Sequence, residues 1–263
     1  MLNIITVMRF LVNTRISNKI STKHIYKYTP MTKKELTSAI QNLIIDGEYD
    51  LNYIDTSNIR DMSHLFHNID DVRKLKKKTY IDISEWDVSN VTNMSGMFMN
   101  CINIDFDISN WNVSKVTTMY KMFHTCNEFT GDLSKWNVGN VVNMESMFVD
   151  CYKFNSNLSK WNVSNVRSMR DMFSSCLSFN SDISNWNVSK VSCMSFMLFH
   201  CHKFNSDISK WNMNNCNDIS YMLNGCTEFN HDLTSWDISW DVKKDKCFSN
   251  CDNLNIIPKW YVY

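Results

Sequence analysis

The sequence predicts a repeat solenoid, an elongated protein in which copies of one short unit stack on each other. Tryptophan recurs seven times at a spacing of 25 residues, and a cysteine follows each of these tryptophans 15 residues later. A unit of this length cannot enclose its own core, so neighbouring copies must share one. The chain of 263 residues has only 5 Gly and 2 Pro, so other residue types must form its turns. The seven tryptophans are Trp86, Trp111, Trp136, Trp161, Trp186, Trp211 and Trp236.

Each unit contains two apolar stretches, and each stretch predicts one flank of a coil. An Ile or Leu lies three residues before each tryptophan, and in the first five units a Val lies two residues after it. Side chains two residues apart share one face of a strand, so Ser-x-Trp-Asn-Val predicts a short strand that pairs in parallel between coils. The next stretch, Val-x-x-Met-x-x-Met-Phe-x-x-Cys, spaces its apolar residues by three and four and predicts a short helical or 3₁₀ turn.

Ser, Asn and Asp occupy fixed positions between the apolar stretches. Their side chains can hydrogen-bond to nearby backbone, so we expect them to turn the chain in place of Gly and Pro. An acidic column four residues before the tryptophans could alternatively bind calcium, but the glycine-aspartate loops of calcium-binding β-solenoids are absent. We therefore interpret this column as turn-forming. Its members are Asp82, Asp107, Asp132, Asp182, Asp207 and Asp232.

The two ends of the chain differ from the regular units. Residues 1–49 predict an N-terminal segment with an α-helical cap, because Thr32 and Glu35 form a capping-box signature ahead of KELTSAIQNLII. Residues 50–263 predict about eight coils. Within them, 50–69 is a degenerate coil, 70–79 a basic loop, 80–251 the regular coils and 252–263 a partial coil.

Charge and hydropathy limit the classes of partner. The 27 basic and 27 acidic residues cancel, so we expect no nucleic-acid partner. No apolar run reaches the length of a membrane span, and we recognise no signal peptide or anchor, which predicts an intracellular protein. The strongest local charge is a basic run that we interpret as a solvated loop, and it comprises Arg73, Lys74, Lys76, Lys77 and Lys78.

The residue types that usually carry chemistry do not form a known motif. There is no GxSxG, phosphate loop or HExxH pattern, so we predict no enzyme, no catalytic residue and no cofactor. His200, Cys201 and His202 are adjacent in sequence and would diverge, so we expect no metal site. Cysteines stacked about 4.8 Å apart could form disulfides, but parallel side chains favour free, buried thiols.

Outward positions of the predicted strand are the best candidates for a partner surface. The residue before each tryptophan varies among the copies, and variation at an exposed position is where a solenoid can acquire specificity. The residue after each tryptophan forms a polar column that could also be structural. The candidate partner-binding residues are Glu85, Asn110, Lys135, Lys160, Asn185 and Lys210 in the first column, and Asn112, Asn137, Asn162, Asn187 and Asn212 in the second.

The repeated text FNSDISNWNVSKV, with its Met and Phe positions, resembles the BspA-like leucine-rich-repeat surface proteins. The similarity is to their 25-residue variant, first noted in mycoplasma surface lipoproteins, and it extends over roughly residues 50–257. The resemblance implies a leucine-rich-repeat-like solenoid without enzymatic activity. It also implies display at the cell surface or secretion, adhesion, and interaction with host proteins. From residues and resemblance together we predict a protein-recognition scaffold, with a surface adhesin as the alternative.

Overall fold

The computed structural model describes residues 26–67, 69 and 78–261. Four cations of the predicted basic loop, Arg73, Lys74, Lys76 and Lys77, lie outside the described residues. The fifth, Lys78, pairs with Asp105 at 2.9 Å.

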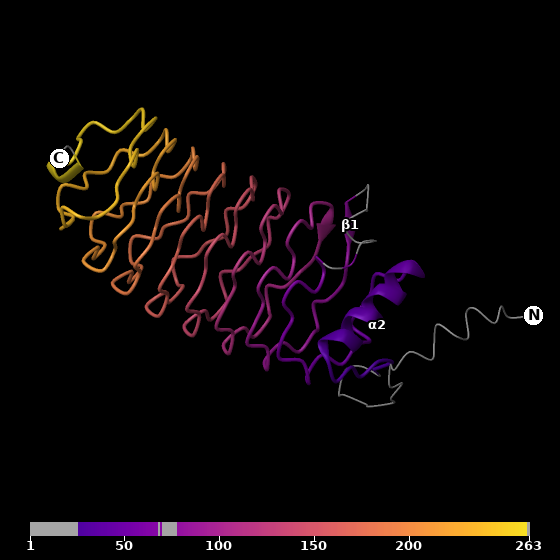
Figure 1. Ribbon diagram of the computed structural model, residues 1–263. Helices are drawn as coiled ribbons and strands as arrows, with labels where there is room; N and C mark the ends of the chain where they lie inside the picture. The colour runs from indigo at the N-terminus through magenta and orange to yellow at the C-terminus, as the bar shows by residue number, and fades with distance from the viewer. Residues whose placement is uncertain (1–25, 68, 70–77, 262–263) are drawn as a thin grey trace, which may run out of the picture.

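Helix α2 spans Lys33–Ile45, in the segment where the sequence predicts a capping helix. The hydroxyl of Thr32 accepts a hydrogen bond from the Glu35 backbone N–H at 3.2 Å, which satisfies one of the free donors of the first turn. The apolar face of the helix, which includes Leu36 and Ile40, is buried. In Figure 1 α2 lies across the N-terminal end of the described units.

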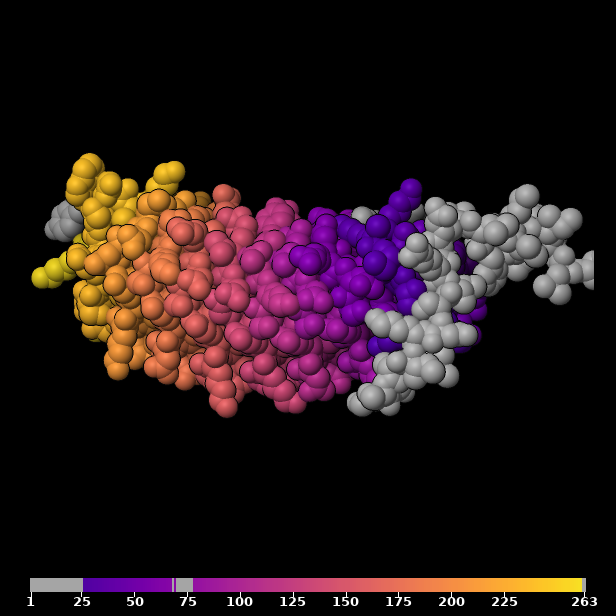
Figure 2. Space-filling view, turned by 90° about the horizontal axis from the view of Figure 1, so that it is seen from below, coloured from indigo at the N-terminus to yellow at the C-terminus, as the bar shows by residue number. Residues whose placement is uncertain are grey.

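After α2 the chain runs through successive units that lie side by side along one axis (Figure 1). Figure 2 shows the result as one elongated body whose colour changes steadily from one end to the other. Regular secondary structure in the described part is sparse. Strands β1 (Thr79–Tyr80) and β2 (Ile104–Asp105) pair in parallel, and η1 (Lys259–Tyr261) is a 3₁₀ turn near the C-terminus.

Single parallel bridges join each unit to the next at intervals of 25 residues. Asn93 pairs with Thr118, Thr118 with Asn143, and the series continues to Lys243. These bridges lie seven residues after each tryptophan. No bridge or strand is assigned at the tryptophans themselves, so the predicted position of the strand is wrong.

We call residues 7 to 14 after each tryptophan the ladder segment. In every ladder segment that precedes another, four alternate backbone N–H groups donate to carbonyls of the following unit, at 2.7 to 3.3 Å. In the first such segment Met94, Gly96, Phe98 and Asn100 donate to Thr118, Tyr120, Met122 and His124. The ladder segments are 93–100, 118–125, 143–150, 168–175, 193–200, 218–225 and 243–250.

A local conformation explains why these N–H groups point the same way. The intervening groups bond within the segment, for example Met97 N–H to the Met94 carbonyl at 3.2 Å, as in a tight turn. Two positions in each ladder segment have positive φ, such as Gly96 at 60° and Asn100 at 62°. These left-handed residues interrupt the run of turns before a helix can form. The methionine stretch, whose side-chain spacing predicts a helical turn, therefore forms the inter-unit ladder instead.

Tryptophan and cysteine fill the core and also bond to the backbone. The indole Nε1 of Trp161 donates to the Leu133 carbonyl of the preceding unit at 3.0 Å, and Trp136 and Trp186 make the equivalent bond. The thiol of Cys176 donates to the Phe148 carbonyl at 3.0 Å. The repeated Met and Phe side chains are buried, as the sequence predicts.

Polar side chains close the turns between the apolar stretches. Near one tryptophan, Asp182 Oδ1 accepts from the Ser184 N–H at 3.0 Å and Asn187 Oδ1 accepts from the Ser189 N–H at 3.1 Å. The same turn recurs from unit to unit with Asp or Asn at its first position. The scarcity of Gly and Pro follows, because a side-chain oxygen takes over the stabilisation of each turn.

Candidate binding surface

The predicted partner-binding columns lie on either side of each buried tryptophan, outside the ladder segments. All eleven candidate side chains are exposed, from Glu85 to Asn212. Because each flanks a buried tryptophan, the columns repeat with the period of the chain. The structure therefore places them on the surface, as expected, but not on the face of a sheet.

A shallow pocket of about 570 Å³ brings four of the candidates together. Lys135 and Lys160 contribute their side chains from neighbouring units, and Asn137 and Asn162 lie after the two tryptophans. The remaining lining residues are Ser134, Trp136 and Asn157. The other seven candidates lie outside this pocket, and they are Glu85, Asn110, Asn112, Asn185, Asn187, Lys210 and Asn212.

Turn formation already occupies part of the asparagine column. Asn137 Oδ1 accepts from the Gly139 N–H at 3.1 Å, and Asn162 Oδ1 accepts from the Ser164 N–H at 3.1 Å. These bonds engage the amide oxygen of each asparagine and leave its Nδ2 group available as a donor at the surface. Lys135 contacts Asn110 Oδ1 at 3.1 Å, so even the variable column is partly linked between units.

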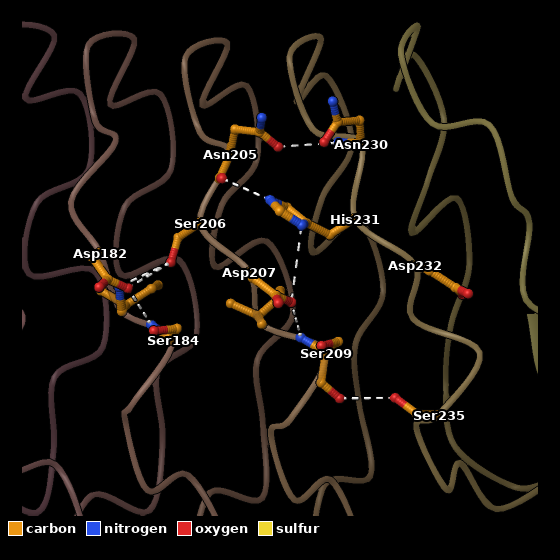
Figure 3. A network of polar contacts seen from close by, with 12 residues as sticks. Asp182, Ser184, Asn205, Ser206, Asp207, Ser209, Asn230, His231, Asp232 and Ser235 are labelled. Carbon is orange, nitrogen blue, oxygen red and sulfur yellow. Dashed lines mark hydrogen bonds and ion pairs between the residues drawn. The ribbon is translucent and has the colours of Figure 1, made fainter.

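A polar network on the acidic column shows what those carboxylates do (Figure 3). Ser206 Oγ donates to Asp182 Oδ1 at 3.3 Å, and the hydrogen bonds from Ser184 lower the pKa of Asp182. Hydrogen bonds from Ser209 likewise lower the pKa of Asp207. Among the residues that the structure describes, no group of three or more His, Cys, Asp or Glu side chains could hold a metal ion.

His231 is part of this network, and the sequence analysis did not single it out. Its Nε2 lies 2.9 Å from the Asn205 carbonyl, and its Nδ1 lies 4.0 Å from Asp207 Oδ1 (Figure 3). The ring bridges two consecutive units. No repeat position predicts a histidine here, so only comparison of this unit with its neighbours could have identified it.

All ten cysteines are free thiols, as the sequence favours, and most are buried. Burial raises the pKa of Cys126 to about 12, and burial also raises the pKa of Cys176 well above its ordinary value. A buried thiol held in its protonated form is a poor nucleophile. The geometry therefore assigns the seven repeated cysteines to the core and to hydrogen bonds with backbone carbonyls.

The outward face of the ladder carries the more variable side chains. The left-handed position ten residues after each tryptophan holds Gly96, Lys121, Ser146, Asp171, Phe196, Tyr221 and Lys246. Phe196 and Tyr221 stack with ring centroids 4.6 Å apart, and Phe199 packs edge-on against Phe196 at 5.5 Å. Sequence reasoning missed this surface because it placed the strand at the tryptophans. The signal was present as variation among copies within the methionine stretch.

The sequence period and the recurring inter-unit bonds define the class as a repeat protein. The chain belongs to the family described as "Mycoplasma protein of unknown function, DUF285", whose model matches residues 70–178 and again 155–260. No curated protein and no solved structure matches the chain. Within the described residues, no helix is both long and apolar enough to cross a membrane.

Proposed function

We propose that the chain is a leucine-rich-repeat-like solenoid related to the BspA-like proteins, and that it serves as a non-enzymatic scaffold for recognising a protein partner. The observation that carries the proposal is the pocket between the units of Trp136 and Trp161. It combines two cations with free amide donors on a surface whose backbone is fixed by turns.

The chemistry of the pocket favours acceptor groups on the partner. Lys160 and Lys135 offer ammonium donors, and Asn137 and Asn162 offer Nδ2 donors beside them. A protein loop with carboxylate or carbonyl oxygens fits such a surface. Because the rim is polar and exposed, its contribution is expected mainly in specificity and association rate.

The test is binding of the natural partner by wild-type protein and by the double variant Lys135→Glu, Lys160→Glu. Reversal of two charges in the pocket should weaken binding by at least about tenfold. Lys153→Glu with Lys203→Glu is the matched control, since it changes the net charge equally at exposed lysines that pair with glutamates instead. Equal affinity of the wild type and the pocket variant would remove this pocket from the binding surface.

A surface adhesin exported by an unrecognised signal is the second candidate function. The family description supports it by its mycoplasma origin. Protease treatment of intact cells distinguishes the two proposals: an adhesin is shaved from the outside, while an internal scaffold is degraded only after lysis.

A further inference from the structure

The acidic column four residues before the tryptophans is interrupted in one unit. The unit of Trp161 has Asn157 at the position where each of the other six units has an aspartate. Asn157 keeps the turn, because its Oδ1 accepts from the Ser159 N–H at 3.0 Å and from the Ser159 hydroxyl at 2.7 Å. Asparagine at this position therefore removes a negative charge from the surface and leaves the local fold unchanged.

The missing carboxylate changes the surroundings of one lysine. Hydrogen bonds from Ser134 are the main cause of the lowered pKa of Asp132, and the charge of Lys135 lowers it further. Lys135 thus lies near a carboxylate of its own turn. Lys160 occupies the same position relative to Asn157, whose side chain is neutral. The ammonium group of Lys160 therefore meets no carboxylate in its own turn.

The residues four and one before each tryptophan together set the charge of that turn. An aspartate and a lysine cancel in the units of Trp136 and Trp211, and the four units that pair an aspartate with a neutral or acidic residue are negative. Only Asn157 with Lys160 leaves a net positive charge. The pocket beside them has two lysines and no carboxylate among its described lining residues. Asp182 lines a neighbouring hollow instead.

The same pocket presents mainly hydrogen-bond donors. The amide oxygens of Asn137, Asn157 and Asn162 each accept from a turn N–H, so each side chain offers its Nδ2 group to a ligand. The ammonium groups of Lys135 and Lys160 lie in the same lining. Five donor groups from two adjacent units thus face one shallow space.

We propose that this pocket binds a phosphoryl group carried by the protein partner, an inference that rests on the proposed function and specifies the group that the partner presents. A phosphorylated side chain carries a charge of about −1.5 to −2 at neutral pH and has three acceptor oxygens. Two lysines match this charge, and the five donors match the oxygens. A carboxylate has one charge and two oxygens, so it would satisfy fewer of the donors.

Binding of small probes to the ¹⁵N-labelled full chain tests the proposal at about pH 8, where a phosphoserine is dianionic. The probes are a capped glycine peptide with one central phosphoserine, the same peptide with serine or with glutamate, and inorganic phosphate. We expect the phosphoserine peptide to shift the Nδ2 signals of Asn137, Asn157 and Asn162. Its Kd should be at least about tenfold lower than those of the serine and glutamate peptides.

The probe series has three outcomes that contradict the proposal. Absence of any shift with the phosphoserine peptide would remove the site. Equal affinity for the glutamate peptide would show that the pocket recognises a carboxylate. Inorganic phosphate that binds as tightly as the phosphoserine peptide would show that the ligand is the free anion and not a group on a protein.

Two isosteric variants should change the affinity in opposite directions. Asn157→Asp restores the residue of the other units and should weaken binding of the phosphoserine peptide at least about tenfold, because it places a like charge in the pocket. Asp132→Asn removes the carboxylate near Lys135 and should strengthen binding by about 1.5- to 5-fold. Asn212→Asp is the matched control, since it adds the same charge two units away and keeps its turn, as Asp87 does in the first unit.

Unchanged affinity of Asn157→Asp, or an equal loss in Asn212→Asp, would refute the proposal. A gain of affinity in Asp132→Asn cannot result from misfolding, so its absence counts against the proposal as well. The result is separable from the test of the proposed function. If Lys135→Glu with Lys160→Glu abolishes partner binding while the phosphoserine peptide does not bind, the scaffold function stands and the phosphoryl site is refuted. If the phosphoserine peptide binds while this double variant retains full affinity for the partner, the proposed function is refuted instead.

Discussion

Glycine should stabilise the protein at the left-handed positions of the ladder, although the chain uses it there only twice. Gly96 and Gly225 have φ values of 60° and 78°, whereas Ser146 occupies the equivalent position to Gly96 with φ 55°. Its N–H donates to the Arg170 carbonyl at 2.8 Å, so the backbone is held in this conformation by the ladder. The informative perturbation is Ser146→Gly.

Two opposing effects set the magnitude. A non-glycine residue in the left-handed region costs about 1–2 kcal/mol, which the substitution removes. Glycine also loses more backbone entropy on folding, which costs about 0.5–1 kcal/mol. The net expectation is therefore stabilisation of up to about 1.5 kcal/mol.

Ser164→Gly provides a matched control at a position without positive φ. Ser164 and Ser146 are both half-buried, so the two variants differ chiefly in backbone conformation. Only the entropy loss applies at position 164, and the control should destabilise by about 0.5–1 kcal/mol.

Urea unfolding followed by far-ultraviolet circular dichroism measures the free energy of unfolding of both variants. The entropy contribution is common to the pair, so their difference reports the left-handed penalty of about 1–2 kcal/mol. Equal destabilisation by the two substitutions would refute the reasoning, because it would mean that Ser146 carries no conformational strain.

Three further predictions concern the core and the turns. Trp161→Phe removes the donor to the buried Leu133 carbonyl and should lower the free energy of unfolding by at least about 1–3 kcal/mol in urea titrations; an unchanged midpoint would show the bond to be dispensable. The folded pKa of Cys126 is about 12, whereas an unfolded thiol titrates near about 8.5. The stability linked to the protonated thiol is therefore complete below the unfolded pKa and should be lost progressively as the pH rises to the folded value. In the same alkaline titration, Cys126→Ala should lose less stability than the wild type. Asp182 has a lowered folded pKa, so its contribution to the free energy of unfolding is complete above the unfolded pKa near about 3.9 and should disappear as the pH falls through the folded value. Asp182→Asn should keep the turn, as Asn157 does one unit earlier. The variant should also show a weaker dependence of stability on pH in the acid range.

The period of the sequence was sufficient to predict which residues form the core. Trp161, Cys176 and Phe173 recur at fixed spacing because each fills one place between neighbouring units, and all three are buried. The pattern also predicted that Asp182 and its equivalents turn the chain. These predictions succeed because burial and turn formation depend on residue type and spacing alone.

The sequence could not predict which part of the unit pairs with its neighbour. At Trp111 the alternation with Val113 resembles a strand, yet the Trp111 N–H bonds locally to the Ile108 carbonyl at 3.1 Å. In the methionine stretch the side-chain spacing resembles a helix, but the spacing carries no information about the sign of φ. Ser146 and Lys121 have positive φ although neither is glycine, so their residue types do not predict the left-handed conformation on which the ladder depends.

This misplacement changes where specificity can reside. Asn137 and Asn162 each use their amide oxygen to close a turn, so substitution there alters the fold as well as the surface. In the six ladder segments that precede another, the residue ten positions after the tryptophan has no such duty, since its backbone N–H makes the inter-unit bond. Phe196 and Asp171 therefore occupy equivalent positions with opposite chemistry. The side chains of this column can therefore differ from unit to unit while the backbone bonds that hold the stack are retained.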